Sequence, residues 1–301
     1  MKAVQFNEYG GPDVLQIVDF ERPQVGPGEV LIAVRAAGVN PADWKIRSGL
    51  MKEVFPRDFP AGVGFEASGI VDEVGAGVTN VAVGDAVFGA GRNTFAEFAV
   101  LSIWARKPDT MSFEQAAALT SNVLTATRIL HAVGVKAGET LLVNGAAGGV
   151  GSAVLQFARE GGINVIGTAT ELKHDYLRSM GATAVTYGPR LIERVKKLAP
   201  DGVDAALDLV GSDVLPDLIA LTGNASRVLA TAGREASKYG ALTTPPMQKN
   251  PEEALARAAE AFERGVFRIH IDRAFPLAET KEAQIASEAK HATGKLVVVV
   301  S

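Results

Sequence analysis

The sequence contains no cysteine and only four histidines among its 301 residues, which excludes disulfides and every thiolate metal site. No apolar run approaches the roughly 18 residues that a membrane span requires. A net charge of −4 and a pI near 5.7 give no basic surface of the kind that binds nucleic acid. The first residues, 1–7, alternate as in a strand and lack the apolar region of a signal peptide. We therefore expect a soluble cytoplasmic protein that binds neither nucleic acid nor membrane.

The first third of the chain has the pattern of short β-strands. Apolar or alternating runs recur between turns rich in proline and glycine. These runs are 3–6, 15–18, 30–36, 68–74, 86–88 and 95–100. Many short strands separated by glycine turns predict a small barrel-like β domain.

The pattern changes at Ser112, which forms a capping box with Gln115 and predicts the start of a helix that ends near Gly134. From residue 140 onward, strands and helices alternate, which predicts a parallel sheet with helices on both faces. We expect strands at 140–143, 163–168, 184–187, 204–209 and 226–231, and helices at 150–160, 171–180, 189–198, 212–222 and 252–264.

After Gly265 the pattern returns to strands, at 267–271 and at 296–300. Because the terminal run is too hydrophobic for an exposed tail, we expect it to rejoin a sheet of the first domain. The doubly wound unit is then an insertion. The expected domains are 1–111 together with 266–301, and 112–265.

The segment 140–151, TLLVNGAAGGVG, carries the strongest functional signal. A buried strand, a glycine-rich turn and an amphipathic helix in succession are typical of a dinucleotide site. Gly148 lets the backbone approach a pyrophosphate, and Gly151 lets the helix pack closely on the strand. Ala146 stands where the usual fingerprint has its first glycine, and a plain tight turn is the alternative interpretation. We expect the nucleotide to contact Ala147, Gly148, Gly149 and Val150.

Six motifs follow one another along the chain in a characteristic order: EYGGPDVLQ (8–16), GEVLIAVRAAGVNPADWKIRSG (28–49), GFEASGIVDEVGAGV (64–78), VGDAVFG (83–89), NGAAGGVGSAVLQFA (144–158) and GKLVVVV (294–300). Together they resemble the zinc-free quinone oxidoreductase branch of the medium-chain dehydrogenase/reductase superfamily, over nearly the whole chain. The resemblance implies a Rossmann NADPH-binding domain inserted into a GroES-like domain, with the cofactor in the cleft. It also implies a homodimer that reduces quinones or related conjugated enones. An enoyl-thioester or enone double-bond reductase and a weakly catalytic NADPH-binding protein are the alternatives.

The resemblance also bears on metal. Zinc-containing members of the superfamily have a cysteine where this chain has Asn40, and a histidine where it has Phe65. Glu66 alone cannot hold a catalytic Zn²⁺. We therefore expect no metal, and we expect Glu66 to be a structural carboxylate that ties the barrel to the cleft.

Without zinc, protein groups must polarise the carbonyl of the hydride acceptor. The resemblance places Asn40 near the nicotinamide and the acceptor oxygen, although a loop amide bonded to backbone is the alternative. Lys45, where the branch commonly has tyrosine, either donates to that oxygen or is a solvated lysine, which we favour. Thr125 matches a nicotinamide-contacting position, or bonds its own helix backbone instead. No residue is assigned as a general base.

NAD-dependent enzymes of this fold usually end the second strand with Asp or Glu, which binds the ribose hydroxyls. Here the strand ends without a charge, in Thr168, Ala169 and Thr170, which favours NADPH, and we expect Thr168 to contact the cofactor. The resemblance places Thr170, Lys173, His174 and Tyr187 beside the 2′-phosphate, and a solvated lysine and a strand-end tyrosine are the alternative. Later strand ends are expected to line the nicotinamide half of the site: Leu209, Val210, Ala232 and Gly233. The loop 234–251 forms either a substrate wall or a dimer contact.

Overall fold

A computed structural model describes residues 1–211, 213–231 and 235–300. Contacts divide the chain into two compact units, Met1–Ser121 with Asn250–Ser301, and Asn122–Lys249. Helices α2 (Phe113–Ala117) and α8 (Pro251–Glu263) thus group with the N-terminal unit, whereas the sequence analysis assigned both to the inserted domain 112–265. The domain boundaries expected from the sequence therefore stay a prediction.

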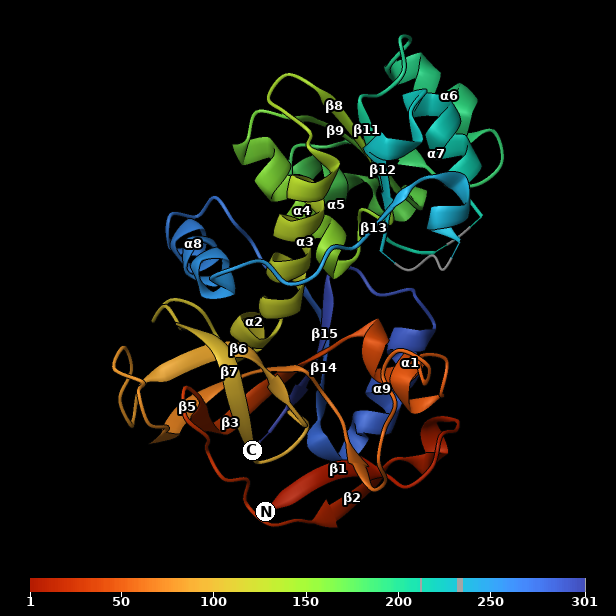
Figure 1. Cartoon of the computed structure of the whole chain (residues 1–301). Helices are drawn as coiled ribbons and strands as arrows, with labels where there is room; N and C mark the ends of the chain where they lie inside the picture. The colour runs from red at the N-terminus through yellow and green to blue at the C-terminus, as the bar shows by residue number, and fades with distance from the viewer. Residues whose placement is uncertain (212, 232–234, 301) are drawn as a thin grey trace. The chain divides into compact units, whose positions relative to one another are not determined.

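The first unit contains a sheet of strand order β14-β15-β3-β5-β6-β7 (Figure 1). Its strands are β3 (Val30–Val39), β5 (Glu66–Val74), β6 (Ala86–Arg92), β7 (Phe98–Arg106), β14 (Ile271–Pro276) and β15 (Lys295–Val299). An additional pairing of β3 with β7 bends this part of the sheet into a barrel. A small sheet of β1 (Lys2–Phe6), β2 (Gln16–Asp19) and β4 (Ala61–Gly62) adjoins it. Alternate side chains such as Ile32, Leu101 and Val298 fill a single core. The barrel-like β domain expected from the sequence is confirmed.

The C-terminal segment confirms one prediction and corrects another. Strand β15 pairs antiparallel with β3, Leu296 opposite Val39, so the terminal run rejoins the first sheet as expected. The strand expected at 267–271 is wrong in position, because β14 begins only at Ile271. Phe267 is buried and its N–H donates to the Ala261 carbonyl at 3.0 Å, which closes the end of α8. Helix α9 (Thr280–Glu288) was not expected, since its buried face consists of small or polar side chains.

The capping box of Ser112 and Gln115 is present as predicted, with the Gln115 N–H donating to Ser112 Oγ at 3.2 Å. The helix that it begins is short, however, and a second helix, α3 (Thr120–Val133), starts three residues after α2 ends. Glu66 Oε2 accepts the Ser121 N–H at 2.6 Å and so provides a partner for the first turn of α3. The predicted single helix is thus divided, and this buried carboxylate stabilises the start of its second part.

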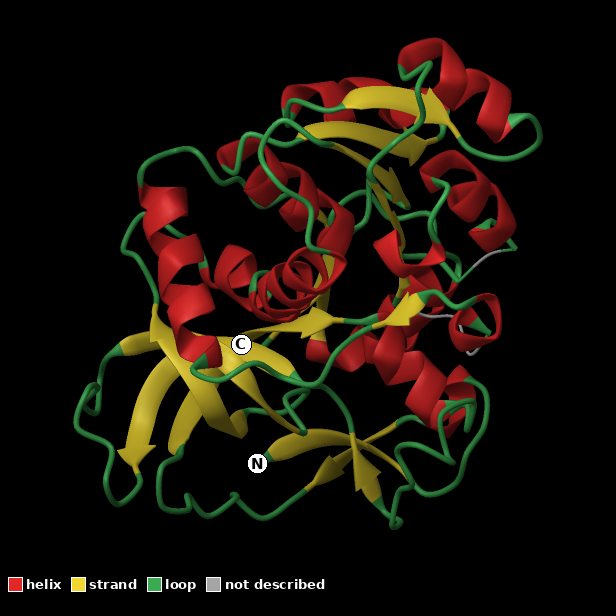
Figure 2. Cartoon of the chain, turned by 45° about the horizontal axis from the view of Figure 1, so that its top comes forward, coloured by secondary structure: helices red, strands yellow, loops and turns green. Residues whose placement is uncertain are grey.

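The second unit is a six-stranded parallel sheet of order β10-β9-β8-β11-β12-β13 with helices on both faces (Figure 2). Its strands are β8 (Thr140–Asn144), β9 (Asn164–Ala169), β10 (Thr183–Thr186), β11 (Ala205–Asp208), β12 (Val228–Ala230) and β13 (Leu242–Thr243). Its helices are α4 (Gly149–Glu160), α5 (His174–Ser179), α6 (Leu191–Leu198) and α7 (Leu215–Thr222). Leucines of α6 and α7 pack on one face. The doubly wound fold is confirmed.

The order of strands reverses between β8 and β11, which are paired in register with Asn144 opposite Asp208. In doubly wound folds, ligands bind beyond the carboxyl ends of the strands at this reversal. Both residues are the last of their strands, so they mark the edge of the sheet where a ligand is expected.

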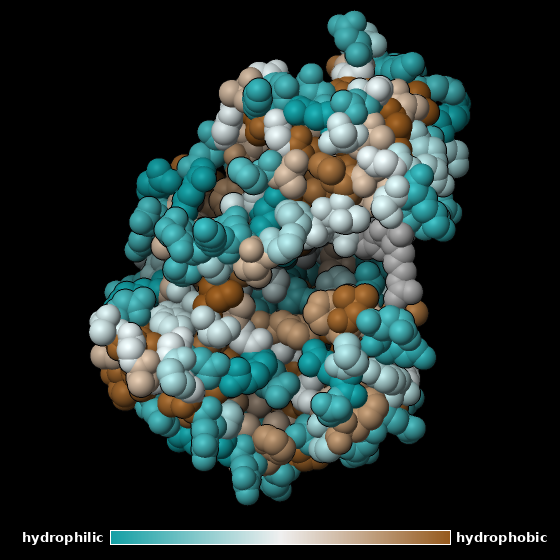
Figure 3. All heavy atoms as spheres, viewed as in Figure 1, coloured by the Kyte–Doolittle hydropathy of each residue, from teal (hydrophilic) through white to brown (hydrophobic). Residues whose placement is uncertain are grey.

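Hydrophilic side chains predominate on the face shown in Figure 3, with apolar residues in small groups among them. Among the described residues, no helix combines the length and the apolar composition needed to cross a membrane.

Candidate active site

The glycine-rich turn after β8 begins at Gly145, which has a positive φ of +83°. A side chain there would also place Cβ 2.6 Å from Val210 Cγ2. The tight turn therefore depends on Gly145. The sequence pattern placed this first glycine one position later, at Ala146. Ala146 itself has a buried side chain.

Gly148 and Gly151 meet different constraints. A Cβ on Gly151 would lie 2.5 Å from the Ala146 carbonyl oxygen and 2.6 Å from that of Gly145, so only glycine lets α4 approach the turn this closely. Gly148 is the N-cap of α4 with an ordinary φ of −78°, and its Cβ would meet only the Gly145 oxygen, at 3.6 Å. The fold thus requires glycine at 151 but not at 148. Gly148 has no side chain to cap α4, and it leaves open space at the helix N-terminus, where anions bind.

A buried polar chain joins three strand ends at this edge. Thr168 Oγ1 donates to Asn144 Oδ1 at 2.8 Å, and Asn144 Nδ2 donates to Asp208 Oδ1 at 2.9 Å. Asp208 Oδ1 also accepts the N–H groups of Val210 and Gly211, at 3.1 and 3.3 Å. The Gly145 N–H donates to Thr168 Oγ1 at 3.2 Å. The Thr168 hydroxyl, expected at the cofactor, thus holds the turn in place.

The sequence missed Asn144 and Asp208. The available signal was a polar residue ending each of two strongly apolar strands. Since such strand ends meet at one edge of a parallel sheet, the pair could have been proposed from the pattern.

The residues expected at the 2′-phosphate lie at the neighbouring strand ends. Ala169 and Thr186 are paired in register at the ends of β9 and β10, so Thr170 and Tyr187, which follow them, leave the sheet at the same edge. Tyr187 is exposed, and Lys173 is partly exposed at the end of a short 3-10 helix that begins at Glu171. His174 differs, because its Nε2 is buried without a hydrogen-bond partner among the described residues.

The remaining expected cofactor contacts are only partly described. Leu209 and Val210 follow β11 and are partly exposed, whereas Ala232 and Gly233 lie outside the described residues. Thr125 is partly exposed on α3. One turn earlier on α3, Asn122 adjoins Gly149 so closely that a Cβ on Gly149 would come within 2.6 Å of its side-chain amide.

Asn40 belongs to a buried cluster in the first unit. Its Nδ2 donates to Glu66 Oε1 at 2.7 Å, and its Oδ1 accepts from Lys295 Nζ at 2.6 Å. Lys295 Nζ also lies 2.6 Å from Glu66 Oε1, which forms an ion pair with side chains 5% and 0% exposed. The sequence missed Lys295, whose only signal was a charge at the head of a run otherwise too hydrophobic to be exposed.

Helix α1 (Pro41–Arg47) begins beside this cluster, with Asn40 as its N-cap. The Asn40 N–H donates to Asp43 Oδ2 at 2.6 Å. Burial raises the pKa of Asp43 to about 7, against the lowering effects of that hydrogen bond and of Lys295. Lys45, on the same helix, is partly buried, and burial lowers the pKa of its ammonium. Lys45 is therefore less solvated than the surface lysine that we favoured.

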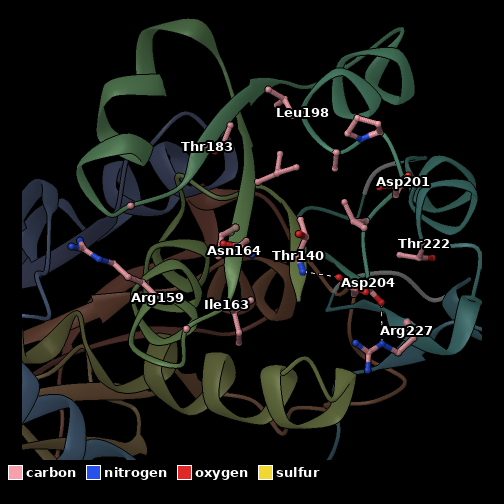
Figure 4. A pocket seen from close by; sticks show the side chains of 18 of the residues that line it. Thr140, Arg159, Ile163, Asn164, Thr183, Leu198, Asp201, Asp204, Thr222 and Arg227 are labelled. Carbon is pink, nitrogen blue, oxygen red and sulfur yellow. Dashed lines mark hydrogen bonds between the residues drawn. The ribbon is translucent and has the colours of Figure 1, made fainter. Parts of the chain in front are cut away.

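A hollow of about 1000 Å³ opens at the opposite, amino-terminal edge of the parallel sheet (Figure 4). Two of its charged side chains, Asp204 and Arg227, hold the surrounding loops. Asp204 accepts the Thr140 N–H at 2.7 Å, and Arg227 donates to the Asp204 carbonyl at 3.0 Å and to Glu139 at 2.6 Å. Because Asp204 and Arg227 already bind the protein, and the hollow lies away from the carboxyl ends of the strands, we assign it no ligand.

Two family models match the chain. That of the alcohol dehydrogenase GroES-like domain matches residues 26–105, and that of the zinc-binding dehydrogenases matches residues 180–298. A quinone oxidoreductase of Pseudomonas aeruginosa is 34% identical, over 99% of each chain. The chain belongs to the quinone oxidoreductase branch of the medium-chain dehydrogenase/reductase superfamily.

Two further relatives of this quinone oxidoreductase family member are informative. The Escherichia coli quinone oxidoreductase, solved in complex with NADPH, superposes with a TM-score of 0.88 at 27% identity, over 99% of this chain and 100% of that one. A chloroplastic protein of Arabidopsis thaliana named NADPH-dependent alkenal/one oxidoreductase is 32% identical, over 99% of this chain and 79% of its own.

The family model that covers the second half is named for zinc, but the residues do not fit the metal. Within 1–211, 213–231 and 235–300, no group of three or more His, Asp or Glu side chains is placed to hold an ion. Lys295 places its ammonium between Asn40 and Glu66, so the carboxylate is already paired with a cation of the protein.

Proposed function

We propose that this chain is an NADPH-dependent oxidoreductase that transfers hydride to quinones or related conjugated enones without a metal. The single observation that carries the nucleotide half is Gly148, a helix N-cap whose glycine the fold does not require. A Cβ there would fill the space that a pyrophosphate would occupy. The NADPH bound to the Escherichia coli relative supports the same cofactor here.

The choice of NADPH over NADH rests on the end of β9. No carboxylate ends this strand. The exposed Glu171 lies at the start of a short helix, where its negative charge interacts favourably with the helix dipole. Thr170, Lys173 and Tyr187 leave the same edge and offer hydroxyl and ammonium donors to a 2′-phosphate. We keep His174 as a fourth candidate through Nδ1, since its Nε2 is buried.

When bound, the reduced nicotinamide supplies the hydride. The chain aligns the reactants, excludes water and stabilises the charge that develops on the acceptor oxygen. We propose Thr125, Leu209 and Val210 beside the nicotinamide, together with Ala232 and Gly233. Asn40 and Lys45 are the proposed residues at the reacting end. The partly buried Lys45 is the better candidate to donate to the acceptor.

The Arabidopsis relative favours enones as a second class of acceptor, because its name specifies alkenals and alkenones. The enoyl-thioester reductase and the weakly catalytic NADPH-binding protein remain the alternatives. The expected homodimer and cytoplasmic location stay predictions of the sequence.

The test is NADPH oxidation by the purified protein with p-benzoquinone, with a simple enone and with a crotonyl thioester, each also with NADH. We expect turnover with the quinone or the enone, and a preference for NADPH. Turnover confined to the thioester would favour the first alternative. Tight NADPH binding without turnover on any acceptor would favour the binding protein.

A further inference from the structure

Arg194 on α6 binds four consecutive backbone carbonyls of the segment that leaves β10. Its Nε donates to the Thr186 oxygen at 3.0 Å, and its two terminal nitrogens donate to the next three oxygens along the chain. These belong to Tyr187 at 3.2 Å, Gly188 at 3.1 Å and Pro189 at 2.7 Å. A guanidinium carries five N–H donors in a rigid planar fork, and four hydrogen bonds of this one go to a single short stretch of backbone.

The backbone of this segment follows an unusual path. Gly188 has a φ of +91° and Arg190 a φ of +66°, which is uncommon for a residue other than glycine. Pro189 has no N–H with which to close a turn. The Leu191 N–H donates to the Gly188 oxygen at 3.1 Å. The path of the chain from 186 to 189 therefore depends largely on the four bonds from Arg194.

The residue whose placement this arrangement controls is Tyr187. Arg194 holds both peptide groups that flank the Tyr187 Cα, through the oxygens of Thr186 and of Tyr187 itself. A tyrosine side chain has only two rotatable bonds, so its hydroxyl is placed accurately once the backbone is fixed. Tyr187 is 53% exposed, which makes its hydroxyl accessible to a ligand. The segment leaves the sheet beside the end of β9, because Thr186 is paired in register with Ala169.

We propose that Arg194 is a positioning residue for the 2′-phosphate of NADPH, and that it acts by fixing the backbone that presents Tyr187. This inference rests on the proposed function, in which the Tyr187 hydroxyl donates to that phosphate. Arg194 acts through its four hydrogen bonds and not through its charge, since its donors already bind carbonyl oxygens. NADH has no 2′-phosphate, so its binding does not depend on this placement.

A double-variant cycle tests the proposal. Tyr187→Phe removes the hydroxyl, Arg194→Met removes the four bonds but keeps an unbranched side chain, and the third variant combines the two. Arg194→Lys separates charge from geometry, because an ammonium keeps the charge but has only three donors at the end of a flexible chain. The matched control is Arg190→Met. It removes the same charge from the same segment, where Arg190 donates to the Glu193 carboxylate at 2.7 and 2.9 Å.

The readouts are thermal unfolding and the dissociation constants of NADPH and NADH by fluorescence titration. Tyr187→Phe should weaken NADPH roughly 10- to 150-fold through the loss of one hydrogen bond to a charged group. Arg194→Met and Arg194→Lys should each weaken NADPH about tenfold or more, but less than about threefold further when Tyr187 is already phenylalanine. Arg190→Met should bind NADPH within about threefold of the wild type, and every variant should bind NADH within the same range.

Equal losses of NADPH affinity from Arg194→Met in both backgrounds would show that Arg194 does not act through Tyr187, and would overturn the proposal. Wild-type NADPH affinity in Arg194→Lys would do the same, because charge alone would then suffice. Equal losses for NADPH and NADH would indicate a general effect on the fold and would also overturn it. Normal NADPH binding by Tyr187→Phe is a different result, since it would refute the phosphate contact in the proposed function and this inference with it.

If the Arg194 variants do not fold, Gly188→Ala perturbs the same segment with Arg194 in place. A Cβ at 188 would meet nothing within 4 Å, but alanine rarely adopts the φ of +91°. This variant should weaken NADPH about threefold or more, leave NADH unchanged, and have no further effect when combined with Tyr187→Phe. Normal NADPH binding in a Gly188→Ala protein whose Tm has fallen would contradict the proposal.

Discussion

Replacing Gly148 with valine should separate nucleotide binding from folding. The backbone at 148 has a φ of −78°, which valine adopts readily, and a Cβ meets only the Gly145 oxygen at 3.6 Å. Because 148 is the N-cap of α4, where valine is less favourable than glycine, the substitution should lower the free energy of unfolding by about 0.5–1 kcal/mol, less than a steric clash would. The same side chain would stand in the space assigned to the pyrophosphate. Loss of one hydrogen bond to a charged group costs roughly 1.5–3 kcal/mol, or roughly 10- to 150-fold in NADPH affinity.

Gly161, the C-cap of α4, and Gly151, inside the helix, provide the controls. Gly161→Val makes the same substitution at the far end of the helix, where a Cβ meets nothing closer than the Phe157 oxygen at 3.4 Å, so it should change neither property. Gly151→Ala forces a Cβ against two backbone oxygens, at 2.5 and 2.6 Å. Overpacking of this kind costs about 1–3 kcal/mol, so Tm should fall by several degrees.

The assay is thermal unfolding and NADPH fluorescence titration on all three variants beside the wild type. Normal NADPH affinity in Gly148→Val would refute the placement of the pyrophosphate. A loss of Tm in Gly148→Val equal to that in Gly151→Ala would refute the distinction between a ligand glycine and a packing glycine.

Three further predictions follow from other parts of the chain. Activity should survive exhaustive dialysis against a chelator, whereas a loss restored only by Zn²⁺ would contradict the metal-free site. Lys173→Ala should weaken NADPH roughly 10- to 150-fold and leave NADH nearly unchanged, and equal losses would mean that Glu171 holds the ribose. Burial raises the pKa of Asp43 from 3.8 to about 7, so protonated Asp43 stabilises the fold at acid pH, and this contribution, on the order of 4 kcal/mol, declines as pH rises from about 4 to about 7. Asp43→Asn should therefore be more stable than the wild type at pH 8 and lose most of that advantage by about pH 4 in denaturant unfolding; an advantage independent of pH would contradict the shifted pKa.

The alternation of strands and helices from residue 140 onward was predictable because each element has its own hydrophobic period and several of the helices are followed by glycine. The same kind of pattern did not predict α9, because its buried face lacks large apolar side chains. It also predicted a strand at 267–271 that is absent there, because Phe267 is bonded to the end of α8 and not to a sheet. Hydrophobic periodicity specifies which face is buried, and it gives little information where that face is small or polar.

The residues of the candidate site likewise divide into those that the sequence could predict and those that it could not. The glycine turn and the end of β9 lie within short segments and could be interpreted locally. Lys295 lies 229 positions from Glu66 and 255 from Asn40, and Asp208 lies 64 from Asn144, so no local spacing links these partners. The sequence predicted that Glu66 is a structural carboxylate, and only the fold identified Lys295 as the ammonium that pairs with it.

The most direct test of the central claim is anaerobic mixing of the purified wild type with NADPH and p-benzoquinone, following NADPH absorbance and hydroquinone together. The account predicts enzyme-dependent loss of NADPH with formation of an equal amount of hydroquinone, at a rate well above that with NADH. NADPH that stays bound but unoxidised, or an equal or faster reaction with NADH, would contradict it.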